Sequence, residues 1–91
     1  MTRAMMGGRL CDLRHLRRLS QAEVGRPAGL SKEAVCRIER GERELSFYEM
    51  ACFAKVLCIS LDAFYRTEAD GRWDITACLL PYTPPAPEAA A

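Results

Sequence analysis

The residues with the clearest chemistry lie in one stretch, SQAEVGRPAGLSKEAVCRIERG, which covers residues 20–41. Its pattern predicts two short helices joined by a tight turn at Gly29. The second helix has an apolar back and a polar front, and the front consists of Lys32, Glu33 and Arg37. A short helix of this kind can enter the major groove of DNA and hydrogen-bond to base edges. The alternative interpretation is an ordinary solvent-facing side of a helix.

Positive charge is concentrated in the half of the chain that contains this stretch. Residues 1–43 hold ten Lys or Arg and five Asp or Glu, whereas residues 44–91 hold three and seven. The two halves therefore carry net charges of +5 and −4, although the whole chain carries only +1. A basic half favours a polyanionic partner such as double-stranded DNA. A solvated charged surface has the same composition, so charge alone leaves both interpretations open.

Length and composition indicate one small soluble domain. The chain has 91 residues, of which 49% are hydrophobic and 27% charged. No apolar run approaches the roughly 20 residues that span a bilayer. The first residues lack the apolar segment of about 7–15 residues found in signal peptides. We therefore expect a cytoplasmic protein that does not bind membranes.

The cysteines and the single histidine indicate neither a metal site nor an enzyme. An odd number of cysteines without CxxC spacing argues against a disulfide scaffold and a zinc finger. Cys11 and His15 are one helical turn apart, but two ligands are too few for a metal site. There is no Gly-rich phosphate loop and no paired carboxylates in an apolar setting. We expect no catalytic residues, no cofactor and no metal.

The elements around the candidate helix predict an all-α bundle of five helices over residues 9–66. Residues 9–19 have a leucine at every third position and a basic outer face. Arg17 and Arg18 on that face could contact phosphate or simply be solvated. Serines at the starts of the later helices have the spacing of N-caps: Ser20, Ser31, Ser46 and Ser60. Pro27 should shorten or bend the last turn of the second helix, because proline removes a backbone hydrogen bond there.

The segments on either side of the bundle have different patterns. Residues 1–8 contain Gly7-Gly8 and lack periodicity, which predicts a flexible arm. Residues 67–80 contain RWDITACLL, whose alternation predicts a β-strand that either pairs with a second copy or packs on the bundle. The strand residues assigned to dimerisation are Trp73, Ile75, Ala77 and Leu79. Residues 81–91, PYTPPAPEAAA, are rich in proline and alanine and predict a disordered tail.

Residues 9–65 resemble the Cro-like, xenobiotic-response-element (XRE) type of helix-turn-helix transcriptional regulators, which have a lambda-repressor-like DNA-binding domain. The segments that carry the resemblance are LCDLRHLRRLSQAEV, GLSKEAVCRIERGER and SFYEMACFAKVLCISLDAFY, which occur in the family's order and spacing. Pro27 and Ala28 depart from the family pattern, in which the second helix has no proline and has a large aliphatic residue at these positions. This difference bears on the orientation of that helix.

The resemblance implies a role for several individual residues. Lys32, Glu33 and Arg37 would face base edges. Four residues would hold the phosphate backbone: Ser20, Gln21, Arg40 and Arg43. Arg14 and Glu39 would form a partly buried ion pair that ties the recognition helix to the scaffold.

The resulting hypothesis is a sequence-specific regulator, a homodimeric repressor that reads a two-fold symmetric operator. The alternative is an antitoxin-type module that neutralises a partner protein through residues 67–91 and regulates its own operon.

Cys36 lies beside the base-reading residues and is either a small apolar filler or a thiol whose oxidation weakens DNA binding.

Overall fold

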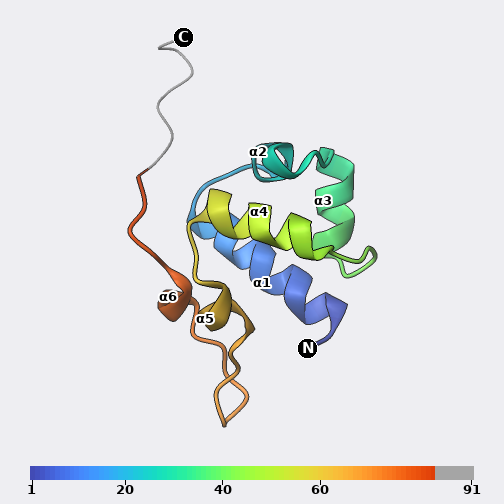
Figure 1. Ribbon diagram of the computed structural model, residues 1–91. Coiled ribbons are helices and arrows are strands. Elements are labelled where there is room, and N and C mark those ends of the chain that lie inside the picture. Colours follow the sequence, from blue (N-terminus) through green and yellow to red (C-terminus); the bar gives the residue numbers. More distant parts are fainter. Residues whose placement is uncertain (84–91) are drawn as a thin grey trace.

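The computed structural model describes residues 1–83, and the regular secondary structure in this part is helical (Figure 1). The elements are α1 (Arg3–Leu16), α2 (Gln21–Gly25), a 3-10 turn η1 (Arg26–Ala28), α3 (Lys32–Glu39), α4 (Phe47–Leu57), α5 (Leu61–Tyr65) and α6 (Ile75–Cys78). The predicted all-α fold is confirmed, with six α-helices in the described residues where the sequence predicted five. None of these helices has the length and apolar character needed to cross a membrane.

Four helices begin where the predicted serine caps lie. The side chains of Ser20, Ser31, Ser46 and Ser60 each accept a hydrogen bond from the backbone N–H three residues later. At α2 and α4 a glutamate also reaches back to the serine N–H, which completes a capping box. Each cap satisfies an otherwise unpaired donor, and each stabilises the fold by about 1 kcal/mol. The helix starts are therefore encoded locally.

Pro27 shortens α2, as the sequence predicts. The α-helix ends at Gly25, and residues 26–28 form the 3-10 turn η1. Gly29 follows in the left-handed region, with φ 72°, where a side chain would be strained. Together these residues make the sharp turn between α2 and α3 (Figure 1).

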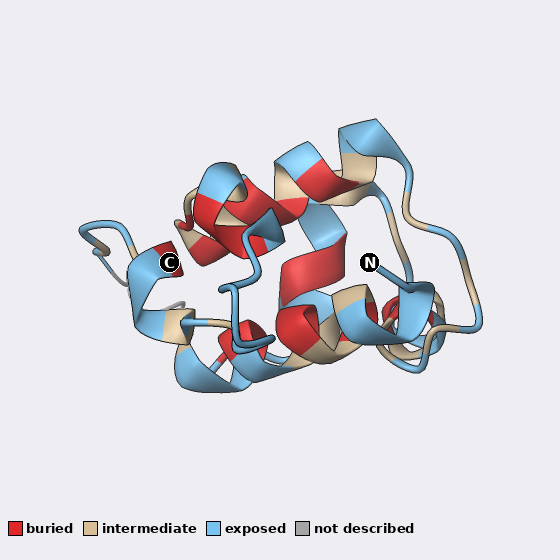
Figure 2. Ribbon diagram, turned by 90° about the horizontal axis from the view of Figure 1, so that it is seen from below, coloured by how far each residue is buried: buried red, intermediate tan, exposed pale blue. Residues whose placement is uncertain are grey.

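The core lies where the inward faces of the helices meet (Figure 2). Its largest fully buried side chains are Phe53, Phe64, Leu13, Leu57 and Val35. The leucine spacing predicted in the first helix is only partly used, because Leu16 is exposed. A three-residue repeat drifts around a helix of 3.6 residues per turn, so Leu16 leaves the face that buries Leu10 and Leu13.

The predicted flexible arm over residues 1–8 is wrong. Helix α1 begins at Arg3, and Thr2 caps it by accepting from the N–H of Met5 at 3.1 Å. Gly7 is buried. The two glycines interrupt the hydrophobic periodicity, which is why the sequence pattern misses the first two turns of this helix.

The predicted β-strand over residues 67–80 is also wrong, since residues 75–78 form helix α6. Asp74 caps it by accepting from the N–H groups of Thr76 and Ala77. Within residues 1–83, extended pairing is limited to a single antiparallel bridge between Ile59 and Leu79. A short side chain that bonds its own backbone competes with an extended conformation, and alternation alone does not reveal that competition.

The C-terminal segment packs beside α5 (Figure 1). The N–H of Ser60 donates to the carbonyl oxygen of Cys78 at 2.8 Å, and the N–H of Leu80 donates to the carbonyl oxygen of Cys58 at 3.1 Å. Of the predicted disordered tail, residues 81–83 continue without helix or strand. Residues 84–91 lie outside the described residues.

Candidate nucleic-acid interface

Helix α3 buries one side and presents the other, as its sequence pattern predicts. Val35 and Ile38 are buried in the core. The opposite side of α3, together with Gln21 from α2, lines a shallow hollow of about 270 Å³. We call this surface the α3 face, and its residues are Gln21, Lys32, Glu33, Cys36, Arg37 and Arg40.

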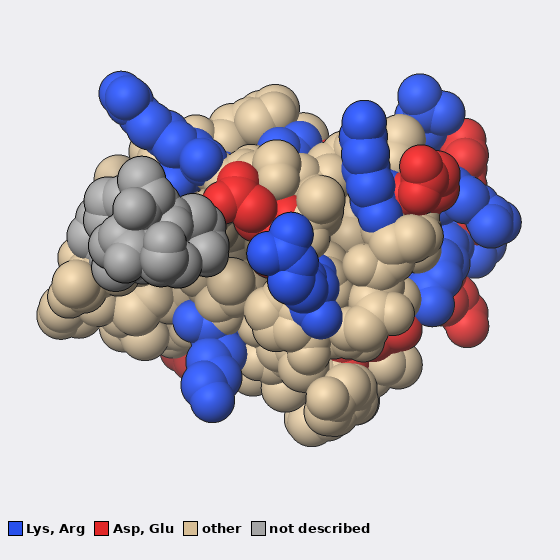
Figure 3. All heavy atoms as spheres, turned by 90° about the horizontal axis from the view of Figure 1, so that it is seen from above, with Lys and Arg blue, Asp and Glu red and all other residues tan. Residues whose placement is uncertain are grey.

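The α3 face brings together all three residues predicted to read bases. Lys32, Glu33 and Arg37 are exposed. Figure 3 views the molecule from the side on which α2 and α3 lie, and Lys and Arg side chains gather there most densely at the end near α3 and the loop after it, with Asp and Glu side chains among them. The surface therefore offers hydrogen-bond donors, a carboxylate acceptor and a positive field on one rigid helix.

An ion pair holds the end of α3 against α1. Arg14 donates from Nε to Oε2 of Glu39 at 2.7 Å and from Nη2 to Oε1 at 3.1 Å. Both side chains are about nine-tenths buried, with 10% and 8% of their surfaces exposed. Gln21 adds a third donor, from Nε2 to Oε1 of Glu39 at 3.0 Å. One carboxylate on α3 is thus bound from both α1 and α2.

The ionised state of Glu39 is built into this arrangement. Burial by itself would raise its pKa, but the hydrogen bonds from Arg14 and Gln21 outweigh burial and keep the pKa below its usual range. Arg14 also donates from Nη1 to the carbonyl of Leu19 at 2.9 Å, which fixes the loop between α1 and α2. The cluster therefore sets the position of both helices that form the turn.

The four residues predicted to hold phosphate differ in how far they are already engaged. Arg40 is exposed on the α3 face. Ser20 caps α2, and Gln21 donates to Glu39. Arg43 donates to both carboxylate oxygens of Glu49, at 3.0 and 3.1 Å. A phosphate would therefore have to share Arg43 with Glu49.

The four residues predicted to form a dimer strand do not share one outward face. Trp73 packs inward, with its ring 6.2 Å from that of Phe64 and beneath the guanidinium of Arg9 at 5.0 Å. Ile75 and Leu79 are half-buried against the core, and Ala77 is exposed. Ile75 and Ala77 differ because residues two apart on a helix point about 200° apart.

Sequence reasoning missed three residues that hold the elements of the domain together, one of them at the site. A Cβ on Gly7 would lie 2.3 Å from the carbonyl oxygen of Ile38, so α1 and α3 touch backbone to backbone there. Arg9 is buried and donates to the carbonyl of Phe64 at 2.8 Å and to Thr67 at 2.9 Å. Arg17 donates to main-chain carbonyls at the end of α4. Glycines and arginines near a chain terminus carry no periodic signal, although the paired glycines inside a helical stretch were a hint of close packing.

Cys11 and His15 lie together, and the guanidinium of Arg14 lies beside them. The Cys11 sulfur is 4.0 Å from Nδ1 of His15 and 3.9 Å from Nη2 of Arg14. Among residues 1–83, no group of three His, Cys, Asp or Glu is arranged to hold a metal ion. Cys36 is half-buried on the α3 face.

The family of this chain follows from a comparison with known protein families. A family model described as a helix-turn-helix domain matches residues 6–72. The chain therefore belongs to the helix-turn-helix family, and it is a DNA-binding domain of the kind found in transcriptional regulators. The regulators of this family typically have no enzymatic activity.

A solved structure gives a more particular likeness. The chain is similar to the restriction-modification controller protein C.AhdI from Aeromonas hydrophila, with 30% sequence identity and a TM-score of 0.64. The match covers 69% of this chain and 96% of that chain. The resemblance to XRE-type regulators that the sequence indicates is thus confirmed. No curated protein sequence matches the chain.

Proposed function

We propose that the chain is a sequence-specific transcriptional regulator that binds double-stranded DNA as a homodimeric repressor. The observation that supports this proposal is the α3 face, where the predicted base-reading residues stand together on a helix whose other side is buried. In this proposal α3 enters the major groove. Lys32 and Arg37 donate to guanine O6 and N7, and Glu33 accepts from cytosine N4.

The phosphate contacts position this helix rather than read sequence. We assign them to Ser20, Gln21, Arg40 and Arg43. The Arg14–Glu39 pair keeps a structural role, since its polar atoms point into the protein and bind one another. Loss of that pair would disturb the angle between α3 and the rest of the domain.

A homodimer is proposed because one such module makes few base contacts. Two modules with recognition helices about 34 Å apart read successive major grooves on one side of the duplex and multiply the specificity. C.AhdI is described as a restriction-modification controller protein, and a regulatory role of the same general kind fits this chain. A dimer bound over a promoter would exclude polymerase, which is the simplest route to repression.

Selection of bound sequences from a random DNA pool tests the proposal. We expect a two-fold symmetric motif. Arg37→Ala should lower affinity for that motif by about 1–3 kcal/mol and relax the preference at one base pair of each half-site. The matched control is Arg72→Ala, which removes an arginine 81% exposed in its side chain and remote from α3, and which should change neither property. If Arg37→Ala weakens binding to all sequences equally, α3 is not the reading element.

Salt dependence separates phosphate contacts from base contacts. Arg40→Ala should weaken binding to all sequences to a similar degree and reduce the slope of log K against log salt by about 1. A partner chain that co-purifies with the protein, combined with weak and non-specific DNA binding, would favour the alternative of a partner-neutralising module.

A further inference from the structure

The outer side of α4 carries much less charge than an exposed helix usually does. The helix buries Met50, Phe53, Ala54 and Leu57. Its opposite side, which we call the outer α4 face, consists of Phe47, Tyr48, Ala51, Cys52, Lys55 and Val56. Phe47 is 89% exposed and Tyr48 67%, and Lys55 is the single charged residue. Clustered exposed apolar residues of this kind mark interaction surfaces.

This face is also hollowed. A groove of about 500 Å³ runs between α4 and the proline of η1, lined by Pro27, Tyr48, Cys52, Lys55 and Val56. Most of the lining is apolar, and the tyrosine stands at one end with the lysine toward the other. The groove therefore has room for a large side chain.

The spacing along α4 makes the face complementary to a second copy of itself. Tyr48 and Lys55 lie at equal distances, about 5 Å along the axis, on either side of the midpoint between Ala51 and Cys52. A two-fold axis through that midpoint, perpendicular to two antiparallel copies of α4, would place each tyrosine over the lysine of the other copy. A lysine over an aromatic ring is an attractive pair. The small residues at the midpoint allow the two helices to approach closely.

We propose that two copies of the chain pair through the outer α4 face, antiparallel and with Tyr48 of each copy against Lys55 of the other. This inference rests on the proposed function, because a two-fold operator calls for a contact in which both copies use the same surface. It assigns to α4 the role that the sequence had suggested for residues 73–79, which fold as part of a helical segment packed on their own chain. The lone charge on the face then meets an aromatic ring rather than an apolar surface.

Sedimentation equilibrium of three variants tests the pairing. Lys55→Glu and Tyr48→Lys should each raise the dimer Kd at least about tenfold, because the first removes the cation and the second places two cations together. The double variant should recover most of the loss, since the new lysine would face the new glutamate across the interface. The two positions are two helical turns apart within one chain, so such a rescue arises between copies. Arg72→Glu, an equal charge change at an exposed loop residue, should leave the Kd unchanged.

A disulfide provides an independent readout of the axis. Cys52 of one copy lies beside Cys52 of the other in this arrangement, so mild oxidation should yield a covalent dimer that Cys52→Ser abolishes and Cys36→Ser does not. A monomer at all concentrations, or single variants with an unchanged Kd, would overturn the pairing. Retained helical circular dichroism in each variant excludes unfolding as the cause of any loss.

The failure of this inference is distinguishable from failure of the proposed function. If the selected DNA motif is two-fold symmetric but Lys55→Glu does not change the dimer Kd, the dimer contact lies elsewhere and the proposed function is retained. Dimerisation through α4 without sequence-specific DNA binding would support the interface and overturn the function.

Discussion

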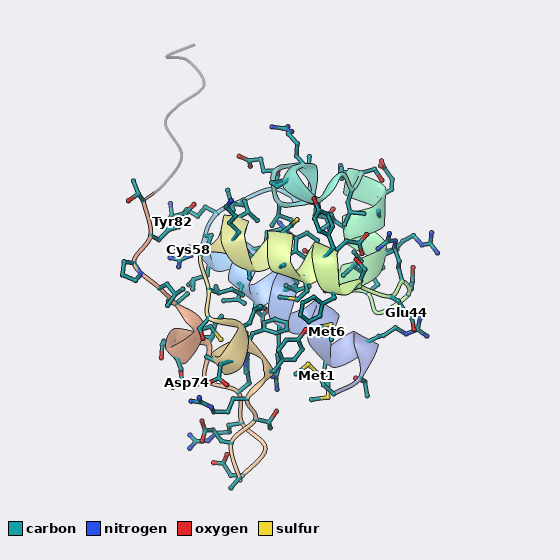
Figure 4. All side chains as sticks on the ribbon, in the orientation of Figure 1. Met1, Met6, Glu44, Cys58, Asp74 and Tyr82 are labelled. Atoms are coloured by element: carbon teal, nitrogen blue, oxygen red, sulfur yellow. The ribbon has the colours of Figure 1, made fainter. Side chains whose placement is uncertain are left out.

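Arg14 and Arg17 lie three residues apart near the end of α1, and they serve opposite parts of the molecule. Arg14 binds the carboxylate of Glu39 and so holds α3. Arg17 donates from Nε to the carbonyl of Leu57 at 2.8 Å and from Nη2 to the carbonyls of Cys58 at 3.0 Å and Leu80 at 3.2 Å. It also stacks on the ring of Tyr82 at 4.2 Å. Figure 4 shows Cys58 and Tyr82 together on the side of the molecule away from α3.

The difference between the two arginines lies in their partners. Arg14 faces a buried charge, and removal of either member leaves the other without compensation. Arg17 faces neutral main-chain carbonyls and a partly exposed ring, and water can replace such partners at smaller cost. Helix α3 is therefore held by a strong, charge-dependent contact. The C-terminal segment is held by several weak contacts that do not depend on the ionisation of a carboxylate.

The largest effect should come from breaking the contact between Arg14 and α3. Glu39→Ala leaves the guanidinium of Arg14 buried without its partner and should lower the free energy of unfolding by about 3–5 kcal/mol. Urea unfolding followed by circular dichroism measures this. Arg66→Ala breaks the exposed pair with Asp62 and should cost about 0.5 kcal/mol or less. Equal losses in the two variants would show that burial of the Arg14–Glu39 pair has no energetic consequence.

The next effect should come from the backbone contact beside that ion pair. Gly7→Ala introduces a Cβ that meets the carbonyl oxygens of Ile38 and Glu39, so it should destabilise the domain by about 2 kcal/mol. Gly8→Ala is a matched control in the same helix turn, because a Cβ there meets nothing within 4 Å. It should stabilise the domain by up to about 1 kcal/mol through helix propensity. Melting temperatures that move in the same direction would contradict the close approach of α1 and α3.

A smaller and more local effect is expected at the C-terminal segment. Arg17→Met retains an apolar stem but loses the hydrogen bonds to three carbonyls, and it should cost about 1–2 kcal/mol. Hydrogen exchange should rise at the amides of Leu79, Leu80 and Tyr82 and stay unchanged in α3. Arg18→Met, at the neighbouring exposed position, is the control and should change neither region. Faster exchange in α3 of the Arg17 variant would mean that the two regions are coupled.

The sequence predicts helix α3 well because the determinants of the helix are local. The serine caps, the glycine at the turn and the apolar back of α3 lie within a few residues of the structure they specify. Pro27 is informative for the same reason, since a proline acts on its own turn. Local signals of this kind survive in one sequence without any knowledge of tertiary packing.

Residues 1–8 and 67–80 were mispredicted because helix caps and tertiary contacts that leave no periodic signal decide their structure. Gly7 lies in a helix that Thr2 caps, and it allows α3 to approach closely, but no periodicity records that approach. Residues 72–80 alternate like a strand, yet the cap at Asp74 starts a helical turn instead. Arg9 and Arg17 have the composition of a basic surface, but their partners are main-chain carbonyls brought in from positions about 40–60 residues away. A charge pattern gives the sign of a side chain's charge but not the direction in which the side chain points.

The smallest and most selective effect should come from lowering the pH. Acid should weaken the contact between Arg14 and Glu39 but not the contacts of Arg17 with main-chain carbonyls. The pKa of Glu39 in the folded chain lies below its ordinary value of 4.5, so the folded state binds fewer protons there than the unfolded state. The stabilisation is therefore fully present above about pH 4.5 and is lost as the pH falls through the folded pKa. Urea unfolding between pH 7 and pH 3 should show a shallower acid loss in Glu39→Gln than in the unmodified chain. Arg17→Met should keep the original slope, because its carbonyl partners do not titrate.

If the slope of Glu39→Gln equals that of the unmodified chain, the acid sensitivity belongs to other carboxylates. Glu23 and Glu49 are such carboxylates, because hydrogen bonds with Ser20 and Arg43, respectively, also lower their pKa values.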